Sequence, residues 1–483
     1  MVYFSGGSTF TDDLKTKVFD NIIELNTESE TWETVAKLRN PRGGHGSSLV
    51  RVEDYRNYVL DCKSTTNERC GSPHWKGDSW CNDENNNEGC GWDGGDCCGD
   101  NVQTANCSSC QCLDQNFYSE AINSTWQIQD LNLIDSTVKD FMTNYKVEGT
   151  SLALVKDGKL VYAKGFGVMD KNTMKPVQAT SLFRIASLSK PITSAALMMM
   201  IEKNLTSLEA KIFGQNGILG TEYGTQPYSE YEEQITLQHL LEHTAGAESW
   251  SNDPWQQDPM WNHMGYNFSQ LIGWVLDTRD PNVQPGTKHA YSNFGFCVLG
   301  RVIEKLTGQS YESYVKDNIL RPIGATGMKI GKSKVSEKDT NEVTYYDYHG
   351  NDEVPYYPHL NVERMDAHGG WIGSTADLAR FLVHFDGMSS RADLISKSTY
   401  DMMTTASSVY NWYAKGWQVN PTRHKNIWHT GILPGTGAFF MSSPSWRISA
   451  VFLMNYRYQS QVDPMMWEII EGIERWPTDL DLF

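Results

Sequence analysis

The chain of 483 residues is long enough for two or three domains with a large core. Acidic residues outnumber basic ones by 59 to 41, and the net charge of -18 argues against nucleic acid or an anionic membrane as a partner. The best candidate for a membrane span, the apolar run 195–201, is far too short to cross a bilayer.

The first segment, residues 1–60, combines short β-type runs with glycine-rich turns. Its marks are the double glycine Gly6-Gly7, Trp32 and the Pro41-Arg42-x-x-His45 step. Together they resemble one repeat of a kelch-type propeller, in which a single blade cannot close the ring or bury its faces. We therefore expect this segment to be the remnant of a longer propeller. A small β-rich appendage packed on its neighbour is the alternative.

The second segment, residues 61–115, is dense in cysteine. Nine of the ten cysteines lie between Cys62 and Cys112, which indicates disulfides and an oxidising, extracellular or secretory compartment. Residues 1–10 lack the basic and apolar regions of a signal peptide, so these observations agree only if further sequence precedes them. Four glycosylation sequons are compatible with a secreted glycoprotein: they begin at Asn106, Asn123, Asn204 and Asn267.

Within this segment, Cys90-Gly91-Trp92-Asp93-Gly94-Gly95-Asp96-Cys97 resembles a Notch-type LNR module. The resemblance implies a module held by disulfides around a structural calcium ion, with oxygen ligands from Asn82, Asn86, Asp93 and Asp96. Asn85 replaces the middle cysteine of that pattern and four cysteines are added, so the pairing stays open. The alternatives are a zinc knuckle through Cys107-x-x-Cys110-x-Cys112, which no histidine completes, and a solvated loop.

The third segment, residues 116–483, mixes helical and strand-like patterns. Strands at both of its ends, with helices between, predict one antiparallel sheet assembled from the two ends of the segment, with a helical region inserted. The expected elements are a helix at 131–145, a hairpin of 151–156 and 159–167 around the turn Asp157-Gly158, a second hairpin of 438–441 and 446–455, and a closing helix at 463–476.

A serine and a lysine stand at the start of an apolar helix in this segment. Pro191 cannot donate a backbone hydrogen bond, so the helix should begin close to Ser187 with the proline in its first turn. Residues three apart share a helix face, so Ser187 and Lys190 can form a nucleophile and base pair if burial or a nearby cation lowers the lysine pKa. Alone, this S-x-x-K spacing is common and more often marks a solvated helix face.

Two further stretches follow in order, Tyr291-x-Asn293 and His429-Thr430-Gly431. With Ser187-x-x-Lys190 they resemble the three motifs of the serine β-lactamase and penicillin-recognising peptidase superfamily. The Tyr-x-Asn form is similar to its class C branch, which also holds D,D-peptidases, D-aminopeptidases and esterases. The resemblance covers roughly residues 127–476 and extends to the stretches 235–246, 369–378 and 452–455.

The resemblance implies an α/β (α+β) fold of the β-lactamase/transpeptidase type, with an antiparallel sheet flanked by helices and a helical subdomain. It also implies catalysis without a cofactor, in which Ser187 accepts the acyl group, Lys190 takes its proton, and Tyr291 assists acylation and deacylation. Substrate would be held by Asn293, His429, Thr430 and Gly431, with an oxyanion hole from the backbone N–H groups of Ser187 and Ile432.

His429 stands where β-lactamases of this class have lysine. An ordinary imidazole is mostly neutral at pH 7, so it would attract a substrate carboxylate only below its pKa. His-Thr-Gly resembles the D,D-peptidases and D-aminopeptidases of the branch, which favours peptidase or esterase activity over β-lactamase activity.

Two functions follow from these patterns. The first is a secreted serine hydrolase that acts on D-amino-acid-containing peptides, other small molecules or esters. The second is a catalytically silent binding or adhesion protein, in which the hydrolase-like domain is a scaffold and the N-terminal modules bind a protein partner. The four polar residues Ser187, Lys190, Tyr291 and Asn293 favour the first, because a scaffold has no need of all four.

Overall fold

The computed structural model describes residues 117–251, 257–346, 360–420, 425–458 and 460–483, together with six short strands within the first 50 residues. The chain divides into two compact units, one of residues 1–97 with 103–106 and one of residues 98–102 with 107–483. The cysteine-rich residues 61–115, including Asn82, Asn86, Asp93 and Asp96, lie outside the described residues, so the LNR module and its calcium ion stay a prediction.

The first unit contains two antiparallel sheets. A two-stranded sheet pairs β2 (Thr9–Phe10) with β3 (Thr16–Lys17). A four-stranded sheet has the order β5-β4-β1-β6, formed by β1 (Val2–Phe4), β4 (Asn21–Asn26), β5 (Thr31–Lys37) and β6 (Ser48–Val50). The kelch-type assignment of residues 1–60 stays a prediction.

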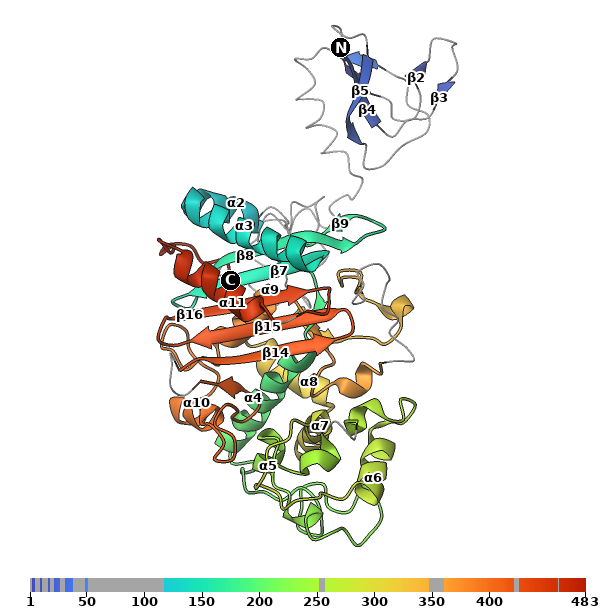
Figure 1. The fold of residues 1–483 in the computed structure, drawn as a ribbon, viewed down its shortest axis with the longest axis vertical. Helices are drawn as coiled ribbons and strands as arrows, with labels where there is room; N and C mark the ends of the chain where they lie inside the picture. Colours follow the sequence, from blue (N-terminus) through green and yellow to red (C-terminus); the bar gives the residue numbers. More distant parts are fainter. Residues whose placement is uncertain are drawn as a thin grey trace, which may run out of the picture. The chain divides into compact units, whose positions relative to one another are not determined.

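The second unit is built on a seven-stranded antiparallel sheet with the order β13-β14-β15-β16-β7-β8-β9 (Figure 1). The last long strand pairs with the first, from Ile448 opposite Lys156 to Met454 opposite Thr150. This confirms the prediction of one sheet assembled from both ends of the segment. The strands are β7 (Gly149–Lys156), β8 (Lys159–Asp170), β9 (Lys175–Pro176), β13 (Gln418–Val419), β14 (Ile427–Leu433), β15 (Thr436–Ser443) and β16 (Ile448–Met454).

Local turn chemistry accounts for the first hairpin. Asp157 and Gly158 have φ angles of 53° and 76°, the positive values that a type I′ turn requires at both central residues. The second predicted hairpin is also present, but its strands run to Ser443 and from Ile448. Its turn therefore lies slightly later in the chain than the sequence predicts, with Arg447 at a φ of 54°.

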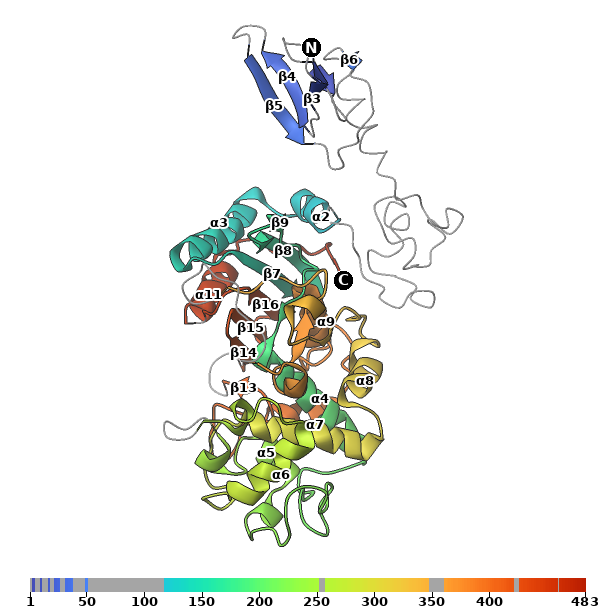
Figure 2. The same ribbon diagram turned by 90° about the vertical axis from the view of Figure 1, so that its right-hand side faces the viewer.

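Helices cover both faces of the sheet. On one side lie α2 (Phe117–Thr125), α3 (Ile128–Tyr145) and α11 (Val462–Gly472), and on the other lies α9 (Thr375–Val383) (Figure 2). The closing helix α11 ends four residues before the predicted end at 476. Among the described residues, no helix has the length and apolar character needed to cross a membrane.

The inserted helical region starts with α4 (Ser189–Glu202), whose residues 189–200 are all buried. A helix that is buried on every side belongs to the core rather than the surface. The small sheet of β10 (Phe183–Arg184), β12 (Trp371–Gly373) and β11 (Lys329–Ile330) leads into its first turn. The other helices are α5 (Leu237–Leu241), α6 (Phe268–Thr278), α7 (Asn293–Thr307), α8 (Tyr311–Val315) and α10 (Lys397–Thr404).

Candidate active site

Ser187 lies in a tight turn where strand β14 passes close to the start of α4. The turn is the 3₁₀ helix η4 (Ala186–Leu188), and Ala186 has a φ of 48°, a left-handed conformation that residues with a side chain rarely adopt. A Cβ atom on Gly431 would lie 2.4 Å from the carbonyl oxygen of Ile185 and 3.1 Å from the backbone nitrogen of Ser187. Glycine at position 431 therefore lets β14 approach the nucleophile turn.

Lys190 is completely buried below Ser187 and contacts three acceptors. Its Nζ lies 3.0 Å from Ser187 Oγ, 2.7 Å from Asn293 Oδ1 and 3.1 Å from the carbonyl oxygen of His368. Burial lowers the pKa of Lys190 to about 7, against the opposing charge of Asp258. An ammonium donates to all three neighbours, whereas a neutral amine has a lone pair that can accept the Ser187 proton.

Asp258 is a buried carboxylate that the sequence motifs did not reveal. Its Oδ2 accepts the backbone N–H of Asn293 at 2.8 Å, and its Oδ1 accepts that of Met260 at 2.9 Å. Burial raises the pKa of Asp258 to about 6, although these two hydrogen bonds and Lys190 favour the charged form. The only sequence signal is an Asp-Pro step, which caps the short 3₁₀ helix η7 (Pro259–Trp261).

Tyr291 and Asn293 flank the N-terminus of α7. Asn293 is the first residue of the helix, and Ser292 caps it by accepting the backbone N–H of Gly295 at 3.0 Å. The Tyr291 ring centroid lies 4.7 Å from Lys190 Nζ. Burial raises the pKa of the Tyr291 phenol, and a hydrogen bond with Ser187 opposes this only in part. A Tyr291 phenolate is therefore disfavoured, and Lys190 is the better proton acceptor.

His429 is buried in β14, and both of its ring nitrogens have partners within the protein. Its Nε2 lies 3.2 Å from the Tyr413 hydroxyl and its Nδ1 lies 2.8 Å from the carbonyl oxygen of Thr430. Burial and the charge of Lys190 lower the pKa of His429 to about 3. The imidazole is therefore neutral at pH 7, as expected of an ordinary histidine, and burial moves the pH below which it could attract a substrate carboxylate far into the acid range.

A cavity of about 880 Å³ opens over the nucleophile. Ser187, Tyr291, Asn293, His429, Thr430 and Ile432 all line it, so the structure brings the three motifs to one place. Gly431 lies beside the Ser187 turn, but an oxyanion hole of the Ser187 and Ile432 backbone N–H groups stays a prediction. The other described residues that line the cavity are Gln257, Trp261, Met264, Leu360, Gln418, Leu433, Pro434 and Arg457.

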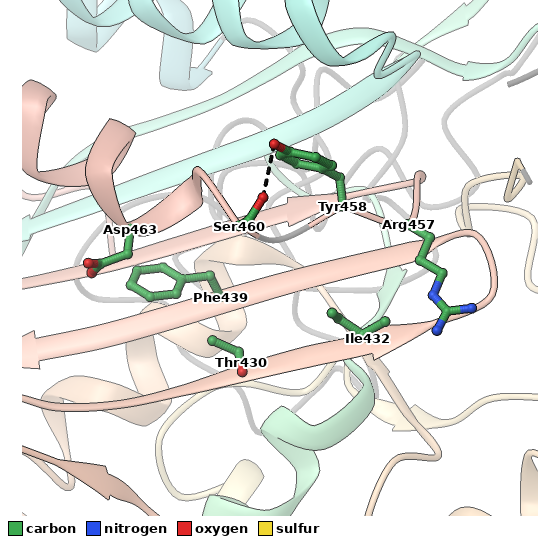
Figure 3. Close-up of a pocket in the computed structure, with 7 residues that line it drawn as sticks. All are labelled: Thr430, Ile432, Phe439, Arg457, Tyr458, Ser460 and Asp463. Carbon is green, nitrogen blue, oxygen red and sulfur yellow. Dashed lines mark hydrogen bonds between the residues drawn. The ribbon is translucent and has the colours of Figure 1, made fainter. Parts of the chain in front are cut away.

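A second hollow of about 750 Å³ adjoins the first and shares Thr430, Ile432 and Arg457 with it. In Figure 3, Arg457 and Asp463 lie at opposite ends of this hollow, with Phe439 between them on the neighbouring strand. Arg457 was not singled out in the sequence, because no motif includes it.

Comparisons with known proteins agree with this geometry. A family model described as Beta-lactamase matches residues 134–473. Penicillin-binding protein 4* of Bacillus subtilis (strain 168) is 25% identical over 350 residues, which is 68% of this chain and 72% of that protein. Protein flp of Staphylococcus aureus (strain N315) is 24% identical over 325 residues, 67% of this chain and 62% of that protein.

Among solved structures, the octameric penicillin-binding protein homologue from Pyrococcus abyssi superposes with a TM-score of 0.58 and 26% identity. The superposition covers 71% of this chain and 76% of that one. The matched residues contain the whole seven-stranded sheet and all three motifs, so the chain belongs to the Beta-lactamase family of serine hydrolases.

Proposed function

We propose that the protein hydrolyses peptides or esters through an acyl-enzyme on Ser187. One observation carries the proposal: Lys190 is buried 3.0 Å from Ser187 Oγ with its pKa lowered to about 7. A structural lysine needs to be charged, whereas a general base must be neutral part of the time at the working pH. Burial of Lys190, with no salt-bridge partner among the described residues, supplies that neutral fraction.

In the acylation step, Ser187 Oγ attacks the substrate carbonyl carbon while its proton passes to the Lys190 amine. The bond to the leaving group then breaks, and that group takes a proton from Lys190 through the Tyr291 hydroxyl, which is hydrogen-bonded to Ser187. Asn293 keeps Lys190 in place through the 2.7 Å contact at its Oδ1. In the second step, water attacks the ester, its proton passes to Lys190, and Ser187 is reprotonated as the acid leaves.

Labelling tests this proposal directly. A fluorophosphonate should add one mass equivalent to the wild-type protein at Ser187, and p-nitrophenyl acetate should be hydrolysed. Ser187→Ala should lose both, with a fall in rate of several orders of magnitude. The matched control is Ser189→Ala, because Ser189 is two residues away but is fully buried and donates to the carbonyl oxygen of Ala186. A folded wild-type protein that is neither labelled nor active would favour the silent scaffold.

Between peptides with a free carboxylate and plain esters, the charges of the cavity favour the former. With His429 neutral, Arg457 is the one permanently charged side chain among the described residues that line the cavity. It is exposed and forms no ion pair with any residue in the described parts of the chain. An unpaired guanidinium at the rim is suited to a carboxylate. We therefore propose that Arg457, rather than His429, attracts the anionic group of the substrate.

A matched pair of substrates separates these two classes. The N-acetyl-D-alanyl esters of 3-hydroxybenzoate and 3-hydroxybenzamide differ in one charge on the leaving group. Wild-type protein should prefer the acid in kcat/KM, and Arg457→Gln should remove the preference without slowing the amide. Arg475→Gln, at an exposed arginine away from the cavity, is the control. Equal rates for both esters in the wild type would assign a plain esterase and leave the Ser187 mechanism intact.

A further inference from the structure

Three buried side chains, from distant parts of the sequence, form a continuous hydrogen-bond network behind the cavity. His243 follows α5, Tyr413 precedes β13, and His429 lies in β14. The Tyr413 hydroxyl lies 3.0 Å from His243 Nε2 and 3.2 Å from His429 Nε2. The exposed fractions of the three residues are 2%, 2% and 1%, so water does not compete for these contacts.

The backbone groups at the two ends of this network fix the direction of every hydrogen bond in it. The backbone N–H of Ser292 donates to His243 Nδ1 at 3.1 Å, so the proton of a neutral His243 is on Nε2. That Nε2–H donates to the Tyr413 oxygen, whose own proton is left to donate to His429 Nε2. The proton of His429 is then on Nδ1, and it donates to the carbonyl oxygen of Thr430 at 2.8 Å.

We propose that Tyr413 is a positioning residue that holds His429 as the neutral Nδ1–H tautomer and ties the Tyr291–Asn293 loop to strand β14. Both ring nitrogens of His429 are engaged within the protein, so the imidazole has no free nitrogen to offer a substrate. Its contribution is to keep Thr430 and Gly431 beside Ser187. The tautomer assignment stands on the hydrogen bonds alone, whereas the effect on turnover rests on the proposed function.

The surroundings of this hydrogen-bond network make a charged imidazole unfavourable. Burial lowers the pKa of both His243 and His429, the charge of Lys190 lowers both further, and a charge on His289 would lower that of His243 again. The rings of Tyr291 and Phe296 lie 4.3 Å and 5.2 Å from His243 between centroids, and they bring no negative charge. One more proton on either imidazole would place two donors against each other. The neutral arrangement is therefore the one that satisfies every group of the hydrogen-bond network.

Nitrogen-15 NMR of histidine-labelled native protein tests the tautomers without a substitution. We expect His243 as Nε2–H and His429 as Nδ1–H, with neither ring titrating between pH 5 and 8. His429→Gln and His243→Gln spectra serve only to assign the signals. An imidazolium signal from His429 at pH 6, or the Nε2–H form of His429, overturns the proposal.

Substitution of the tyrosine tests the positioning role. Tyr413→Phe removes the donor to His429 Nε2, so the His429 signal should shift toward mixed tautomers, and kcat/KM for p-nitrophenyl acetate should fall about tenfold. Tyr410→Phe is the matched control, because the Tyr410 ring contacts that of His289 with a centroid distance of 4.4 Å but the residue is 42% exposed. A folded Tyr413→Phe protein with the wild-type His429 signal contradicts the role. If Tyr413→Phe does not fold, the native titration still decides.

Discussion

At the residue scale, the protonation of Lys190 controls whether Ser187 can react. Because the pKa of Lys190 is lowered to about 7, the amine is protonated below that pH and cannot accept the serine proton. We therefore expect kcat/KM for a neutral ester to rise as the pH increases through about 7 and then to level off. Stopped assays with p-nitrophenyl acetate between pH 5 and 9 measure this. A rate that is flat across pH 7 would contradict a lysine base.

Asp258 should set the position of that pH dependence. Its carboxylate raises the pKa of Lys190 against the larger effect of burial. Asp258→Asn removes the charge but keeps an oxygen for the backbone N–H of Asn293, which Asp258 accepts at 2.8 Å. The Lys190 pKa should then fall further, and the acid limb of the rate profile should move down by about one pH unit. Movement of the limb to higher pH would mean that Asp258 acts through folding rather than through charge.

Because His429 is neutral, its titration should not affect substrate binding near neutral pH. With its pKa near 3, the imidazole does not change charge between pH 5 and 8. The Michaelis constants of the matched acid and amide esters should therefore follow parallel pH profiles in this range, because the charge of His429 does not change there. A limb near pH 6 that is confined to the acid ester and disappears in His429→Gln would show that His429 titrates there and attracts the carboxylate in its protonated form.

At the scale of elements, the site depends on how closely β14 approaches the nucleophile turn. Gly431→Ala would place a methyl group 2.4 Å from the Ile185 carbonyl oxygen, so either β14 or η4 must move. We expect a loss of about 1–3 kcal/mol in the free energy of unfolding, as for other overpacked sites. Because small displacements of reacting groups are costly, kcat/KM should fall roughly a hundredfold.

Gly265→Ala is the control for this prediction. A Cβ atom there meets nothing within 4 Å, and the backbone is not in the left-handed region. Denaturant unfolding and ester hydrolysis should both match the wild type. Wild-type activity in Gly431→Ala would show that β14 and η4 can move apart without loss of catalysis.

The elements themselves were largely predictable, because each depends on local chemistry. The turn at Asp157-Gly158 and the start of the buried helix near Ser187 follow from residue types alone, and both are present. The resemblance carried by the three motifs also implied that they meet in one site. The partners of Lys190 and His429 were not predictable, because Asp258 and Tyr413 belong to no motif and reach the site only through the tertiary fold. Likewise, a pKa depends on burial, which the sequence does not specify.

At the scale of the whole molecule, the cysteine-rich segment 62–112 and residues 117–483 should depend on different forces. Residues 117–483 contain one cysteine, Cys297, which is buried and free, so this part of the chain cannot form an internal disulfide. Its core instead joins both faces of the sheet to the buried helix α4. The other nine cysteines belong to residues 62–112, where the sequence predicts disulfides and calcium in place of a core.

Removal of calcium together with reduction should therefore separate the two regions. We expect a chelator with a thiol reductant to raise amide hydrogen exchange across residues 62–112. A module without a core unfolds when its disulfides are reduced and its metal is removed. Exchange in β7, β14 and β16 should stay unchanged, and so should p-nitrophenyl acetate hydrolysis. Cys297 packs in that core as a free thiol, so reduction breaks no bond there, and the described residues form no cluster of side chains suited to a metal ion. Chelator alone and reductant alone distinguish the two contributions. Unchanged exchange across residues 62–112 under the combined treatment would contradict the predicted calcium module. A loss of ester hydrolysis that accompanies increased exchange would show that residues 117–483 depend on the cysteine-rich segment for their stability.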